Sequence, residues 1–193
     1  MTPTTSAAPA RASARERLLD AADELFYEDG IHSVGIDRVI ERAGVAKATL
    51  YSTFGSKDEL VRAYLLRRHE RWRARMLAGL ERYETPRERL LGVFDVLAET
   101  AASPTFRGCY VVNANAESPR GAAVEEVSDL ARADRLALFE TLAREAGVDD
   151  PAQLAAVFML LYDGAVVGSR LDHDAAVVST ARAVAEEALD RSG

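Results

Sequence analysis

The chain has 193 residues, of which 48% are apolar and 28% are charged, with one Cys and three His. At roughly 150 residues per domain, this length gives more than one average domain and less than two. The composition is that of a folded protein rather than a disordered one. The lone cysteine excludes an internal disulfide and a cysteine-cluster zinc site, and the scattered histidines exclude the usual His-rich metal patterns. We therefore expect no metal and no cofactor.

The sequence carries no signal that directs the chain to a membrane. No apolar run approaches the roughly 20 residues that span a bilayer. Residues 1–12 are rich in Thr, Ser, Ala and Pro, and they lack the apolar segment of a signal peptide. We expect these residues to form a disordered arm, and the protein to be cytoplasmic with no membrane partner.

Charge is divided unevenly along the chain. The net charge of −7 disfavours a nucleic-acid partner when it is taken as an average. Residues 1–80, however, carry 13 Lys and Arg against 11 Asp and Glu, a net +2, whereas residues 81–193 carry 11 against 20, a net −9. Six arginines between residues 62 and 75 form a basic stretch, which is usually a solvated helix face. Both lysines of the chain, Lys47 and Lys57, also fall in the positive part.

Start and stop signals of helices recur along the chain and predict an all-α fold of about nine helices. Ser13 with Glu16, and Thr85 with Glu88, form capping boxes, and Asp150-Pro151 is a further helix start. The predicted helices cover residues 13–29, 36–43, 46–53, 57–82, 86–101 and 105–117, then Ser118-Pro119 to about 146, 151 to about 170, and Asp172 or Asp174 to about 190. The second and third are short and flank a Gly44-Val45 turn, which is the helix-turn-helix pattern.

Residues 17–61 resemble the DNA-binding domain of the TetR family of bacterial transcriptional regulators. The matching residues are Leu19-Asp20-Ala21-Ala22, Leu25-Phe26, Gly30, Ala43-Gly44-Val45, Lys47, Thr49-Leu50-Tyr51, Phe54 and Ser56-Lys57-Asp58-Glu59-Leu60. The chain length and the helix count also suit this family. The resemblance implies a DNA-binding domain over residues 13–56 and a C-terminal effector-binding and dimerisation domain over residues 57–193.

The helix at residues 46–53 is the expected recognition helix, because it offers small and polar side chains while Leu50 points to a core. The resemblance places Thr49, Tyr51, Thr53 and Lys57 mainly on phosphates, and Lys47, Ala48 and Ser52 nearest the bases. Lys57 also lies in the first turn of a helix, where free N–H groups favour a phosphate. The plainer alternatives are a packing role for Tyr51 and ordinary surface positions for the two lysines.

Three sites depart from the family pattern. Gly35 and Ala46 stand where many relatives have a polar residue that caps a helix, and Ser52-Thr53 replaces bulkier residues. These departures leave the operator sequence and the affinity open, but not the fold.

The last two predicted helices are candidates for a homodimer interface. Residues 153–162 are apolar nearly all round. Residues 175–188 repeat Ala and Val, and small residues let helices approach closely. The expected interface residues are Leu154, Phe158, Leu161, Ala165, Ala181, Val184 and Ala188. The alternative is that both helices form an internal core.

Residues 107–117 resemble a Gly-Cys…Asn-Ala-x-Ala-Glu segment of one TetR subgroup. A buried amide needs a partner, so Asn113 either meets a ligand or ties the neighbouring backbone together. Cys109 is interpreted as a small apolar filler rather than a sensor thiol. The candidate pocket residues are Trp72, Met76, Phe94, Tyr110, Asn113, Phe139, Tyr162 and Asp163, of which any aromatic residue alternatively belongs to the core.

Together these patterns predict a ligand-responsive regulator with double-stranded operator DNA and a small-molecule effector as partners. A repressor released by its effector is the favoured form, and an activator of the same fold is the alternative. An enzyme is not expected, because the chain has no Gly-rich phosphate loop and no defensible Ser/His/Asp set. A helical enzyme that uses the C-terminal cavity, or an interaction protein that uses the helix-turn-helix as a scaffold, remain the competing classes.

Overall fold

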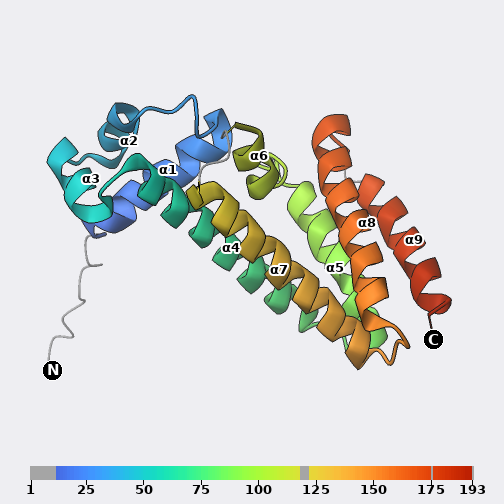
Figure 1. Cartoon of the computed structure of the whole chain (residues 1–193). Coiled ribbons are helices and arrows are strands. Elements are labelled where there is room, and N and C mark those ends of the chain that lie inside the picture. Colours follow the sequence, from blue (N-terminus) through green and yellow to red (C-terminus); the bar gives the residue numbers. More distant parts are fainter. Residues whose placement is uncertain (1–11, 118–121, 175, 193) are drawn as a thin grey trace, which may run out of the picture.

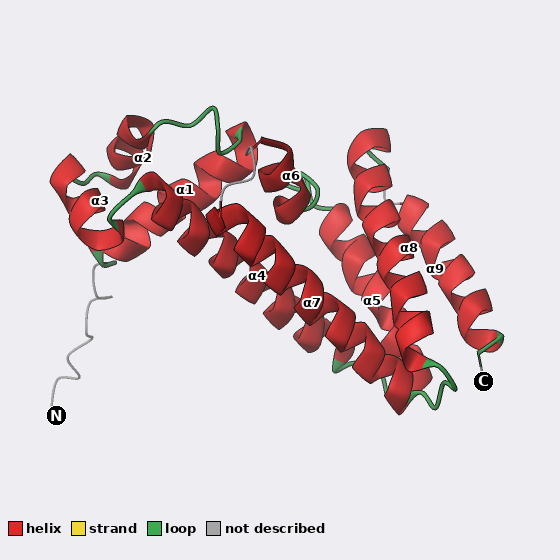
Figure 2. Cartoon of the chain, viewed as in Figure 1, coloured by secondary structure: helices red, strands yellow, loops and turns green. Residues whose placement is uncertain are grey.

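The protein is described by a computed structural model, which covers residues 12–117, 122–174 and 176–192. Over these ranges the chain is all-α, with nine helices and no strand, as predicted (Figures 1 and 2). The helices are α1 (Ala14–Asp29), α2 (Ile36–Ala43), α3 (Lys47–Phe54), α4 (Lys57–Leu80), α5 (Pro86–Ala101), α6 (Tyr110–Glu117), α7 (Ala122–Glu145), α8 (Pro151–Asp172) and α9 (Ala176–Asp190).

The capping signals account for most helix starts. Ser13 and Thr85 each form a complete capping box, with Glu16 and Glu88 respectively. The Asp150 side chain accepts a hydrogen bond from the Gln153 N–H at the start of α8, and such caps satisfy donors that have no partner inside the helix. Residues 1–11 of the arm expected at residues 1–12, and the helix start expected at Ser118-Pro119, lie outside the described residues.

The sequence prediction was wrong at the start of α6. A helix was expected from residue 105, but α6 begins at Tyr110. Gly108 has a φ of +85°, which a right-handed helix cannot accommodate. The segment before α6 is therefore a turn that brings Gly108 and Cys109 beside α4 and α8.

Helices α1, α2 and α3 gather at one end of the molecule, while α5, α8 and α9 lie at the other end (Figure 1). Helices α4 and α7 run side by side between the two ends. The first half of α4 belongs to the N-terminal core through Leu60 and Tyr64, and its second half belongs to the C-terminal core through Met76 and Leu80. The predicted boundary at residues 56/57 therefore falls at the start of a helix that both cores share.

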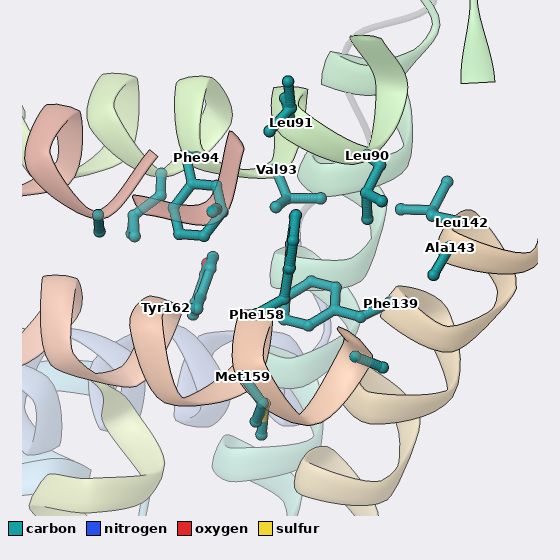
Figure 3. Packing of buried hydrophobic residues seen from close by; sticks show 14 of the residues in the cluster. Leu90, Leu91, Val93, Phe94, Phe139, Leu142, Ala143, Phe158, Met159 and Tyr162 are labelled. Carbon is teal, nitrogen blue, oxygen red and sulfur yellow. The ribbon is translucent and has the colours of Figure 1, made fainter. Parts of the chain in front are cut away.

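The C-terminal core is built around aromatic side chains from α5, α7 and α8 (Figure 3). The ring centroids of Phe94 and Phe158 lie 5.5 Å apart, and those of Phe139 and Tyr162 lie 5.6 Å apart. Phe94, Phe139 and Phe158 are fully buried. These contacts fix the angle between α7 and α8, and they leave the opposite face of α8 uncovered.

Helix α8 ends at Asp172, slightly beyond its predicted end, and its apolar stretch is longer than expected. Its 22 residues contain a window with a mean hydropathy of 1.5, long and apolar enough by composition to cross a membrane. In the structure α8 is instead a central helix of the C-terminal core, between α7 and α9. At Gly168 of α8, a Cβ atom would lie 2.8 Å from Cγ1 of Val177 in α9. Glycine at this position therefore permits the close approach of the two helices.

Candidate nucleic-acid interface and regulatory cavity

The turn between α2 and α3 holds the two helices at a fixed angle. Gly44 adopts a φ of +62°, the left-handed conformation in which glycine is favoured. The N–H groups of Gly44 and Val45 donate to the carbonyls of Glu41 and Ile40, which closes α2. The Arg17 side chain of α1 donates a hydrogen bond to the Gly44 carbonyl at 3.2 Å, which connects α1 to the turn.

Helix α3 turns one side chain inward and presents the others to solvent. Leu50 is fully buried in the N-terminal core. Lys47, Ala48, Tyr51 and Ser52 are exposed, whereas Thr49 and Thr53 are half-buried. The Tyr51 side chain is 45% exposed, which argues against the alternative that it serves mainly as a packing residue. The hydroxyls of Ser52 and Thr53 both donate to the Thr49 carbonyl, and this fixes their rotamers on the surface.

The two lysines have different environments. Lys47 Nζ lies 2.9 Å from Asp37 Oδ1 in an exposed ion pair, and the hydrogen bond that Lys47 donates to Asp37 raises the pKa of the lysine. Lys57 is half-buried, donates to the Ile31 carbonyl at 2.7 Å, and lies over the Phe26 ring. Lys57 therefore ties the α1–α2 loop to α4, a structural contact that the sequence analysis missed.

Both departures from the usual capping pattern are visible at the helix starts. Neither Gly35 at α2 nor Ala46 at α3 supplies a side-chain cap. Among the described residues, no side chain caps the first N–H groups of either helix, so these groups can meet solvent or an anion.

A cavity of about 140 Å³ is lined by residues of α1, α4, α5, α6, α7 and α8 and of the turn before α6. Three of the predicted pocket residues line it, namely Trp72, Tyr110 and Tyr162. The Trp72 indole N–H donates to the Tyr162 hydroxyl at 3.0 Å, which joins α4 to α8 across the cavity. Burial raises the pKa of Tyr162, so its hydroxyl stays protonated at neutral pH.

The other predicted pocket residues lie elsewhere. Met76, Phe94 and Phe139 belong to the C-terminal core and do not line this cavity. Asp163 binds Arg132 and Arg135 instead of facing the cavity. The Asn113 amide donates to the Arg107 carbonyl at 2.9 Å, which is the backbone-tying alternative.

The charged lining of the cavity was not predicted from the sequence. Arg68, Arg71 and Arg75 of α4 and Arg135 of α7 all line it. The first three follow the spacing i, i+3 and i+7, so they share one helix face. The basic stretch is therefore not simply a solvated face. Arg135 carried no signal of its own, because one arginine on an amphipathic helix ordinarily lies at the surface.

A family model described as bacterial regulatory proteins, tetR family, matches residues 18–64. The chain is 32% identical over 141 residues to the HTH-type transcriptional activator FasR of Mycolicibacterium smegmatis. The aligned region covers 70% of this chain and 61% of the relative. It is 36% identical over 78 residues to the uncharacterized HTH-type transcriptional regulator Rv1255c of Mycobacterium tuberculosis, 40% of this chain and 39% of the relative. The chain thus spans less than two thirds of either relative.

A crystal structure covers nearly the whole chain. SCO4454, a TetR-family transcriptional regulator from Streptomyces coelicolor, has a TM-score of 0.85 and 33% identity over 93% of this chain and 95% of that one. The chain belongs to the TetR family. The reduced form of Escherichia coli NemR has a TM-score of 0.82 at 22% identity, over 90% of this chain and 95% of that one, and it shares the fold.

In this TetR-family chain, residues that line the cavity form hydrogen bonds with α1, the first helix of the DNA-binding domain. Asp23 of α1 accepts hydrogen bonds from both Arg68 and Arg71. The Tyr27 hydroxyl donates to the Gly108 carbonyl and accepts from the Arg107 N–H. The cavity wall therefore contacts α1 by two routes, one through α4 and one through the turn before α6.

The outward face of α8 differs from the interface predicted for it. Leu154, Phe158, Ala165 and Ala181 are buried within the protomer, so they pack in its core and form little of its exposed surface. Leu161 and Ala188 are half-buried and pack against the same core. The exposed large apolar side chains among the described residues of these helices are Leu160 (70% exposed), Val167 (43%) and Leu171 (71%) on α8 and Val184 (42%) on α9. Only Val184 was predicted, because a helix that is apolar all round gives no signal for its outward side.

Proposed function

We propose that this TetR-family chain is a homodimeric, DNA-binding transcriptional regulator. It acts in the cytoplasm as a repressor that a small-molecule effector releases from operator DNA. The observation that carries the proposal is the α3 surface, where Lys47, Ala48, Tyr51 and Ser52 are exposed on a helix anchored by buried Leu50. A recognition helix needs this combination of a fixed inner side and small, polar or aromatic groups towards the bases.

The charge distribution supports DNA as the partner of this surface. The chain is acidic overall, yet its first 80 residues have a net charge of +2. The N-termini of α2 and α3, which no described side chain caps, add N–H donors that favour phosphate oxygens. Lys57 donates one hydrogen bond to the Ile31 carbonyl in the free protein, and the other donors of its ammonium group are available for the proposed phosphate contact.

Dimerisation follows from the geometry of operator recognition. Two recognition helices reach successive major grooves when they lie about 34–36 Å apart. The exposed stripe of Leu160, Val167 and Leu171 follows the spacing i, i+7 and i+11 along one face of α8. An apolar stripe of this kind is the natural contact between two copies across a two-fold axis.

Effector control is assigned to the cavity beside Trp72 and Tyr162. Its wall includes Arg68 and Arg71, which hold Asp23 of α1. A ligand that moves either arginine changes the seating of α1 on α4, and with it the separation of the two recognition helices. An activator is the second candidate, because the relative FasR is described as a transcriptional activator.

Selection from a random pool of DNA duplexes tests the proposal. We expect the purified protein to enrich an inverted repeat, and Tyr51→Ala and Lys47→Ala to weaken binding to it. Arg144→Ala is the matched control, since it removes one exposed positive charge at the far end of α7. A reporter gene behind the selected repeat then separates repression from activation. Failure to enrich any sequence would favour the enzyme or scaffold classes.

A further inference from the structure

We infer that the effector is a compact organic monocarboxylate, whose anionic group binds Arg135 while its apolar body fills the cavity beside Trp72. This inference rests on the proposed role of the cavity as the effector site. It goes further by naming the chemistry of the ligand and the residue that selects it.

The first support is a surplus of positive charge around the cavity. Four guanidinium groups line it, and no Asp or Glu does. The carboxylates that partly compensate them are shared, because Asp23 binds both Arg68 and Arg71, and Asp163 binds both Arg132 and Arg135. Arg75 forms no ion pair with any other described residue. An anion is the ligand that this wall attracts most strongly.

The second support is the environment of Arg135. This side chain is 5% exposed, and Nη1 lies 3.1 Å from Asp163 Oδ1. Its Nε atom is buried and has no hydrogen-bond partner among the described residues. Leaving a charged donor unpaired in the interior is costly. A carboxylate that accepts from this guanidinium in the bidentate manner would supply the missing partner.

A cationic ligand is disfavoured because the aromatic faces are already occupied by arginine. The Arg135 guanidinium lies 4.9 Å from the Trp72 ring centroid and 5.2 Å from that of Tyr162. The Arg68 guanidinium lies 3.6 Å from the Tyr27 centroid. Aromatic rings of this kind bind cations through their faces, and here the protein supplies the cations itself.

The size and the walls of the cavity define the apolar body of the ligand. Its volume of about 140 Å³ is close to the roughly 150 Å³ of an engineered apolar cavity that admits benzene. Leu97, Phe106 and Val166 provide apolar contacts beside Trp72. One six-membered ring or a short alkyl chain therefore fits, with its carboxylate turned towards Arg135.

The test uses benzoate, benzamide and benzylamine, which share one ring and differ in charge. Calorimetry on the full chain should show benzoate binding at least about tenfold more tightly than benzamide, as expected for a charge-assisted hydrogen bond. Benzylamine should bind more weakly still. Quenching of the fluorescence of Trp72, the single tryptophan of the chain, gives an independent measure of ligand binding in the cavity. Benzamide or benzylamine matching benzoate, or no binding of benzoate, would overturn the inference without any variant.

Two matched variants then assign the selectivity. Arg135→Gln should abolish the preference for benzoate over benzamide. Arg132→Gln should preserve it, because Arg132 is exposed, binds the same Asp163 and does not line the cavity. An unchanged preference in a folded Arg135→Gln protein would contradict the assignment. Affinity for the selected duplex, measured without any ligand, reports separately on the proposed DNA-binding function, so the two proposals fail in distinguishable ways.

Discussion

At the scale of single residues, the two lysines should separate DNA binding from stability. Lys57→Met leaves the Ile31 carbonyl without its partner, so the free energy of unfolding should fall by about 1–3 kcal/mol. Lys47→Ala removes only an exposed ion pair, so stability should be unchanged while DNA affinity falls. Urea unfolding and fluorescence anisotropy measure the two quantities. Equal stability of both variants would show that the Lys57 contact contributes nothing.

His69 should make stability depend on pH. Its Nε2 lies 3.2 Å from Asp134 Oδ2, and its Nδ1 lies 3.2 Å from the Tyr110 hydroxyl. Burial lowers the pKa of His69 below the ordinary value of 6.5, although Asp134 partly opposes this. The unfolded chain therefore takes up the proton more readily. The stability that neutral His69 contributes is fully present above pH 6.5, and it is lost as the pH falls through the lower folded-state pKa.

Replacing His69 by Gln should flatten this dependence. Urea unfolding of wild type and His69→Gln is compared at about pH 7.5 and about pH 5.5, above the range in which exposed carboxylates titrate. We expect wild type to lose more stability than the variant over that interval. An identical loss in both proteins would assign the pH dependence to other groups.

Prediction from the sequence succeeded for residues whose burial or exposure is decided by one local pattern. Leu50 is buried and Tyr51 exposed because a short helix that packs on α1 has a single inner side. The hydrogen bonds of Lys57 and Arg135 were not predicted, because their partners Ile31 and Asp163 come from distant segments. Such contacts depend on how whole helices pack, which local patterns do not contain.

At the scale of elements, the exposed and buried faces of α8 should respond differently to mutation. Leu160→Asp or Leu171→Asp places a charge on the proposed interface, so light scattering should show dissociation to monomers with the fold intact. Leu130→Asp, on an exposed position of α7, is the control and should leave the dimer unchanged. Phe158→Ala should instead cost about 3–5 kcal/mol of stability, because it empties the core.

Wild-type protein that is monomeric at micromolar concentration would contradict the interface. So would a dimer that survives both charged substitutions on α8. Either result would support the alternative that α8 and α9 form only an internal core.

The sequence predicted helices well because each start signal acts locally. Ser13, Thr85 and Asp150 cap helices through contacts three residues away. The turn before α6 escaped prediction because Gly108 adopts its positive φ where the segment packs against Arg170. The outward side of α8 also escaped, since its apolar residues surround the helix and only the packed neighbours decide which side is free.

At the scale of the whole molecule, effector and operator binding should be linked. Asp23 and Tyr27 join the cavity wall to α1, and α4 belongs to both cores. Any compound that weakens operator binding by a given factor must have its own affinity weakened by operator DNA by the same factor. Calorimetry with and without the operator duplex measures this factor. Equal affinities in the two titrations would rule out allosteric release.

The most direct test of the central claim is the affinity for the selected duplex relative to a scrambled duplex, measured by anisotropy over a range of salt concentrations. A sequence-reading surface on α3 predicts a ratio of at least about 10³ near physiological salt, together with a linear decrease of log affinity with log salt. Tyr51→Ala should lower the ratio, and the Arg144→Ala control should not. A ratio near one in the wild-type protein would contradict the account, because it would show that the α3 surface does not read DNA sequence.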